Sequence, residues 1–103
     1  MSELFNKRAL FTSLVPKLIE KMIDTGKVPL LGRDGLKHIA NSLHYDGLAV
    51  DIDLFRNGIY LTKTSDHTEY GEYWKSLHPD CRWGGDFQNQ DGNHYSIIYQ
   101  GRQ

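Results

Sequence analysis

The apolar residues in the first quarter of the chain recur at helical spacing. Between Asn6 and Thr25 they fall three or four positions apart, as on one face of an amphipathic helix. Pro16 lies inside this pattern, and a proline in a helix interior removes a backbone hydrogen bond. We therefore expect Pro16 to kink this helix or to divide it in two. Gly26 follows the last periodic residue and is a good candidate for the residue that ends the helix.

The middle of the chain changes to strand patterns. Residues 27–31 form a short apolar run before a glycine, which predicts a strand. Residues 48–55 alternate, so that Asp51 and Asp53 share one face and the apolar side chains share the other. The dipeptide Asn57-Gly58 is a strong signal for a two-residue hairpin turn, and it predicts that the apolar residues after it form the returning strand.

The last forty residues predict one more helix and one more strand. Residues 66–77 have helical periodicity, and we expect Asp66 to be the N-cap with Glu69 as its capping-box partner. Residues 83–87 are predicted to form a tight aromatic and glycine loop, and residues 94–99 a final strand. The fold class is therefore α+β, with a small antiparallel sheet packed against an N-terminal and a central helix.

Composition excludes several classes of protein. The 103 residues predict a single domain, 1–103, and the 12 basic and 13 acidic side chains are well mixed, giving a net charge of −1. No basic stripe supports nucleic-acid binding. Cys81 is the only cysteine, so it makes no intramolecular disulfide, and we interpret it as an incidental thiol in a reducing compartment. Without a signal-like start or a membrane-spanning run, the chain is expected to be cytoplasmic as synthesised and to need another factor for release.

Two segments bring together the residue types of a metal site. Residues 42–51 contain His44 and Asp51, and some forty residues later Asp91 stands three positions before His94. Two imidazoles and one carboxylate suit Zn²⁺ with an open position for water, and a second carboxylate nearby is what a general base requires. The plainer interpretation is that each histidine is structural or solvated, that Asp51 is paired with a buried donor, and that Asp91 is a turn residue.

The order of these residues resembles a known family. Ser-x-His-x-x-Gly-x-Ala-x-Asp at 42–51, Trp-Gly-Gly at 83–85 and Asp-x-x-His-aromatic at 91–95 are similar to the M15 peptidases, the D-alanyl-D-alanine carboxypeptidase and L-alanyl-D-glutamate endopeptidase group. The chain most resembles the short phage endolysins of that group, from about Leu31 to Tyr99. The resemblance implies an abbreviated form of the fold that these D,D-peptidases share with hedgehog-type domains.

The resemblance also implies a chemistry. A zinc ion would be held by His44, Asp51 and His94, and the water bound to it would attack a stem-peptide bond of bacterial peptidoglycan. Asp91 would accept the water's proton and pass it to the departing amine. The bond cleaved, the target bacterium and the oligomeric state stay open.

One departure from the family pattern concerns catalysis. Family members usually have a longer segment before the first ligand, with an arginine that stabilises the oxyanion or holds the substrate. Here only Arg33 is available, as a substitute or as an exposed turn residue. If nothing replaces that cation, the barrier rises by about 2.7–4 kcal/mol, and the alternative function is a zinc-stabilised, non-catalytic binding or structural domain.

The remaining candidates are supporting residues. Ser42 is predicted to hydrogen-bond the site from behind the ligands or to cap its loop, and Trp83 and Tyr95 are predicted to support the site or to form aromatic walls for the substrate. Three further histidines are expected at the surface or in caps: His38, His67 and His78.

Overall fold

A computed structural model of the chain describes residues 1–32 and 42–103. Its helices and strands are α1 (Glu3–Asp24), β1 (Val28–Leu31), β2 (Ala49–Arg56), β3 (Ile59–Leu61), η1 (Thr64–His67), α2 (Thr68–Leu77), β4 (Cys81–Trp83), η2 (Gly84–Asp86) and β5 (His94–Ile97). The α+β class predicted from the sequence is confirmed. The segment that contains Arg33 and His38 lies outside the described residues.

The N-terminal helix is continuous. Its first turn is capped by Ser2, whose hydroxyl accepts a hydrogen bond from the backbone N–H of Phe5. Pro16 lies within α1 and does not divide it, so the division that the sequence allowed is wrong. The proline is exposed, and the carbonyl that it leaves unbonded belongs to Thr12, which is also exposed, so water can take the missing bond.

The end of α1 follows the sequence prediction. Gly26 has φ +87°, Gly26 N–H donates to the carbonyl of Ile23, and Lys27 N–H donates to that of Met22. These two bonds form a Schellman motif, which favours glycine at the left-handed position. The chain thereby reverses directly into β1.

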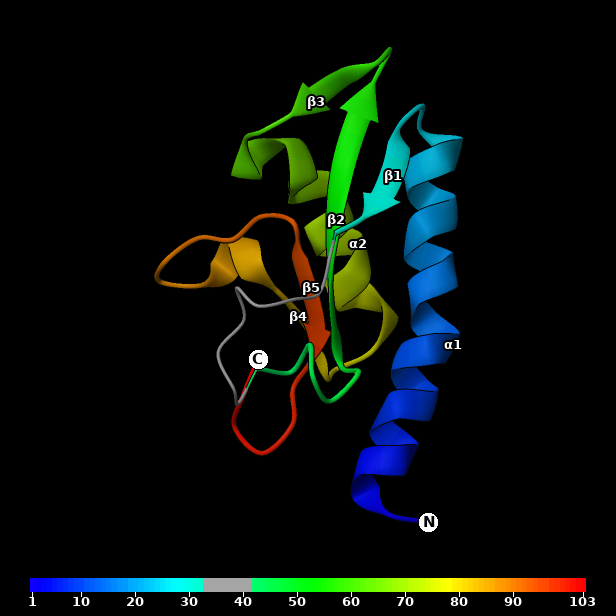
Figure 1. Cartoon of the computed structure of the whole chain (residues 1–103), viewed down its shortest axis with the longest axis vertical. Coiled ribbons are helices and arrows are strands. Elements are labelled where there is room, and N and C mark those ends of the chain that lie inside the picture. The colour runs from blue at the N-terminus through cyan, green and yellow to red at the C-terminus, as the bar shows by residue number, and fades with distance from the viewer. Residues whose placement is uncertain (33–41) are drawn as a thin grey trace.

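The sheet is antiparallel throughout, in the order β1-β2-β5-β4, with β3 also paired to β2 (Figure 1). The long strand β2 is shared: β5 pairs with residues 49–51 and β3 with residues 54–56. Asn57 (φ 51°) and Gly58 (φ 77°) make the predicted hairpin turn between β2 and β3. Successive side chains of β2 point to opposite faces of the sheet, as the alternation predicts.

The core lies on the helical face of the sheet. Ile52 and Leu54 of β2 are fully buried there, and the ring of Phe11 in α1 meets that of Trp74 in α2 edge-on at 5.9 Å. Tyr95 of β5 also packs edge-on against Trp74. Asp51, Asp53 and His94 therefore fall on the opposite face, since neighbours along a strand alternate and paired residues share a side.

Three local predictions are corrected by the structure. Trp83 was assigned to a loop, but it ends strand β4 and pairs with Tyr95. The predicted capping box is wrong, because Asp66 lies inside η1 and its carboxylate accepts the N–H of Lys63. The final strand ends at Ile97, two residues earlier than expected. No helix in residues 1–32 and 42–103 is long and apolar enough to cross a membrane.

Candidate metal centre

His44, Asp51 and His94 meet on the face of the sheet away from the helices. One ligand atom from each lies within 4.8 Å of the other two. Asp51 Oδ1 stands 3.5 Å from Nε2 of His44 and 3.5 Å from Nδ1 of His94. The centroids of the two imidazole rings are 5.1 Å apart and their planes meet at 73°, an edge-on arrangement.

The local structure explains this convergence. Asp51 and His94 are directly paired residues of β2 and β5, which puts their side chains on one face. His44 reaches the same point from a compact turn, in which Tyr45, Asp46 and Leu48 donate backbone hydrogen bonds to Ser42 and Leu43. A loop and a pair of strands therefore bring the three side chains together, as the sequence spacing predicts.

The site is sheltered and partly charged. His44 and His94 are 9% and 7% exposed, and the side chain of Asp51 keeps 21% of its surface. Burial by itself would lower the pKa of His94, but the hydrogen bond to Asp51, the hydrogen bond to the main chain of Gln103 and the charges of Asp51 and Asp91 together raise it. Two imidazoles around one carboxylate are a donor set that suits a divalent cation such as Zn²⁺.

Asp91 stands beside the cluster on a tightly held turn. Its N–H donates to Gly84, and its carbonyl accepts the N–H of His94 at 3.1 Å. The indole N–H of Trp83 donates to the carbonyl of Gly92 at 2.7 Å. A side chain at Gly84 would collide with this turn, since its Cβ would lie 2.8 Å from that of His94. The carboxylate of Asp91 is thus exposed on a fixed backbone next to a candidate ligand.

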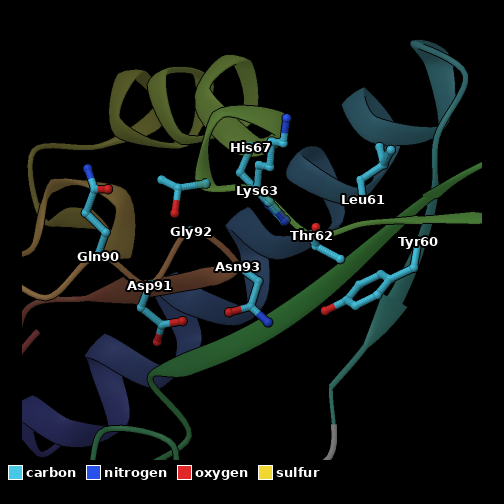
Figure 2. Close-up of a pocket in the computed structure, with 10 residues that line it drawn as sticks. Tyr60, Leu61, Thr62, Lys63, His67, Gln90, Asp91, Gly92 and Asn93 are labelled. Carbon is cyan, nitrogen blue, oxygen red and sulfur yellow. The ribbon is translucent and has the colours of Figure 1, made fainter.

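A polar pocket of about 220 Å³ opens on the other side of Asp91. It is lined by residues 60–64, His67 and residues 90–93. Figure 2 shows Tyr60 and Asp91 on opposite sides of it, with Asn93 between them. The carboxylate of Asp53 orients both side chains: it accepts hydrogen bonds from Asn93 Nδ2 at 3.0 Å and from the hydroxyl of Tyr60 at 3.3 Å.

The structure distinguishes the alternatives predicted for the supporting residues. Trp83 (4% exposed) and Tyr95 (fully buried) lie in the core, so neither forms a wall for substrate. Their apolar rings are buried because β4 and β5 pair under α2. Trp83 supports the turn of Asp91 through its indole N–H. Ser42 accepts the backbone N–H of His44 at 3.2 Å, which is the loop-capping alternative. Arg33 and His38 lie outside the described residues.

His67 is the polar residue of this region that the sequence analysis missed. It is expected at the surface or in a cap, and it does occupy the N-cap position of α2, without a capping hydrogen bond from its side chain. It is not at the surface: it is 3% exposed, and its Nδ1 shares a 2.8 Å hydrogen bond with the hydroxyl of Tyr95. Burial lowers the pKa of His67, against the charges of Asp66 and Asp53. The sequence pattern indicates this burial, because His67, Tyr70 and Trp74 are spaced as one face of a helix.

The fold and this cluster define a small α+β protein with a sheltered His-Asp-His site of the kind that holds a catalytic metal. The family model described as D-alanyl-D-alanine carboxypeptidase matches residues 37–97, more than half of the chain and all of the cluster. The chain therefore belongs to the M15 peptidase family, whose members are metal-dependent. No curated protein matches it.

Proposed function

We propose that this protein is a zinc-dependent peptidase that hydrolyses stem-peptide bonds of bacterial peptidoglycan, of the phage endolysin type, with residues 1–103 acting as one domain. The observation that carries the proposal is the convergence of His44, Asp51 and His94 beside an exposed carboxylate, in a chain of the M15 family. A structural zinc site is normally closed by four protein ligands, and it needs no such carboxylate.

The roles of the chain's own groups follow from their positions. Nε2 of His44, Nδ1 of His94 and Oδ1 of Asp51 would hold the ion. When bound, zinc polarises a carbonyl and lowers the pKa of water toward 7. Asp91 would take the proton from the attacking water and return it to the amine that leaves. Because its backbone is fixed by Gly84 and His94, Asp91 would keep its position as the substrate arrives.

The polar lining of the pocket suits a peptide better than an apolar molecule. It combines hydroxyl, amide and charged side chains, and Asp91 belongs to its lining. A peptide cleaved next to Asp91 would extend from the metal cluster into this pocket, where hydrogen bonds to backbone groups would orient it. Tyr60 and Asn93, both fixed by Asp53, are the side chains best held for that purpose.

The proposal is tested by incubating zinc-loaded protein with purified peptidoglycan and identifying new amino and carboxyl ends by mass spectrometry. Chelated protein is the matched control. Release of stem-peptide fragments by the loaded protein alone is expected. Zinc binding without any release, on walls that an unrelated lysin digests, would favour the non-catalytic domain instead.

A further inference from the structure

The segment Tyr99–Gln103 folds back onto the metal cluster. Tyr99 and Arg102 exchange two backbone hydrogen bonds of 3.0 Å around a two-residue turn. In that turn Gln100 has φ 50° and Gly101 φ 73°, the positive values of a type I′ hairpin. We call residues 99–103 the terminal hairpin. Figure 1 shows the end marked C beside the loop that begins at Ser42.

The terminal hairpin brings one main-chain oxygen to two side chains of β5. Gln103 O lies 2.7 Å from Nε2 of His94 and 2.5 Å from the hydroxyl of Ser96. His94 and Ser96 are two positions apart on one strand, so both side chains point to the same face. A main-chain oxygen only accepts, and its lone pairs can serve both donors.

That contact decides which nitrogen of His94 faces the cluster. Since Nε2 donates its hydrogen to Gln103, Nδ1 is the atom turned toward Asp51, 3.5 Å from Oδ1. When a cation replaces the hydrogen on Nδ1, the neutral imidazole that keeps its hydrogen on Nε2 presents a lone pair at Nδ1. The outer hydrogen bond thus sets both the orientation of the ring and the atom offered to a cation.

The same hairpin also contacts the segment of the other histidine. The guanidinium of Arg102 stands 2.7 Å from the carboxylate of Asp46, two residues after His44. Arg102 also lies over the ring of Tyr99, which keeps it close to its own hairpin. One short element therefore joins the loop of His44 to the strand of His94.

We propose that the terminal hairpin is a positioning element of the metal centre, with the main-chain oxygen of Gln103 orienting His94 and the Arg102–Asp46 pair aligning the loop of His44. The inference rests on the metal site of the proposed function. It adds residues 99–103, which lie beyond the part of the chain that the family model matches.

Two glycines give a matched test. Gly101 (φ 73°) and Gly58 (φ 77°) occupy the same position of two type I′ turns, and a Cβ at either would meet nothing within 4 Å. Gly101→Ala and Gly58→Ala therefore impose the same backbone strain, but only the first loosens the terminal hairpin. Zinc affinity is measured by competition with a chromophoric chelator, and the Nε2 proton of His94 is followed by NMR in the zinc-loaded proteins.

Gly101→Ala is expected to weaken zinc binding about tenfold and to speed exchange of the His94 Nε2 proton. Gly58→Ala should leave both unchanged. Arg102→Gln should weaken zinc binding by about two- to fivefold, as expected for an ion pair whose side chains are 31% and 30% exposed, and the exchanged pair Arg102→Asp with Asp46→Arg should restore part of the loss.

The outcomes distinguish the positioning role of the terminal hairpin from the metal site itself. Wild-type affinity in Gly101→Ala, or an equal loss in both glycine variants, would overturn the positioning role and leave the metal site standing. A wild-type protein that binds no zinc would overturn the site and the inference together.

Discussion

Asp51 and His94 are directly opposite each other in the antiparallel ladder of β2 and β5, with Oδ1 of the first 3.5 Å from Nδ1 of the second. Their pairing makes the register of the sheet a determinant of the metal site. A slip of one residue would turn one of the two side chains to the helical face. Zinc binding therefore reports on correct strand pairing as well as on the identity of the ligands.

Asp51→Asn should remove the stabilisation of the protein by zinc, because the amide oxygen is a weaker ligand without charge. In the wild type, free zinc at about 100 times Kd should raise the free energy of unfolding by about 2.7 kcal/mol. Calorimetry with and without zinc measures the difference. Asp53→Asn, two residues along the same face, is the control and should keep the zinc effect; a loss in both would contradict a specific role for Asp51.

Asp91→Asn should lower kcat on peptidoglycan fragments by about 10²–10⁴-fold, because an amide cannot accept the proton of water. Zinc affinity should stay within about threefold of the wild type, since Asp91 is assigned no bond to the metal. Asp86→Asn is the control: Asp86 is exposed and pairs with Lys75 at 2.7 Å. If Asp91→Asn keeps full turnover with zinc bound, Asp91 is not the base.

His67 should make the stability of the protein depend on pH below neutrality. Its pKa is lowered in the folded protein by burial, so the unfolded chain binds more protons once the pH falls below about 6.5. The contribution of His67 to the free energy of unfolding should then fall as the pH drops from 6.5 toward the folded pKa. His67→Asn keeps a hydrogen-bond partner for the Tyr95 hydroxyl and does not titrate, so in denaturant titrations the stability of the wild type relative to the variant should fall from pH 7 to pH 5. His94, whose pKa is raised, titrates in both proteins and cancels in this difference. An unchanged profile would contradict this assignment.

Gly71→Ala should destabilise the protein although alanine favours helices. Gly71 lies in α2 against the indole of Trp83, and an added Cβ would overlap that ring. Overpacking of this kind costs about 1–3 kcal/mol, more than the ~1 kcal/mol that alanine adds as a helix former. Ser76→Ala, at an exposed position of the same helix, should change the free energy of unfolding by less than about 0.5 kcal/mol. A Gly71→Ala protein as stable as the wild type would show that Trp83 can shift freely.

Much of the local structure was predictable because it depends on near neighbours in the chain. The stripe of Phe11, Leu14, Leu18 and Met22, the Gly26 end of α1 and the Asn57-Gly58 turn each follow from side-chain period or from one backbone angle. The alternation around Asp51 likewise assigned the faces of β2 correctly. Such features are set within a few residues.

The errors concern residues whose environment comes from distant segments. The aromatic-wall alternative for Trp83 and Tyr95 is wrong, because pairing of β4 with β5 under α2 buries both. The surface alternative for His67 is wrong, because Tyr95, 28 positions away, provides a buried partner. No local pattern reports such partners.

The sequence by itself determined the family, most of the elements and the set of residues able to bind a metal, because residue type and spacing are written along the chain. Only the tertiary structure decided that His44, Asp51 and His94 lie close enough to bind one ion. It also decided which nitrogen of His94 faces the cluster, and that Gln103 holds the His94 ring. The physical reason is that distances between atoms far apart in sequence are set by strand register and packing, which depend on the whole chain at once.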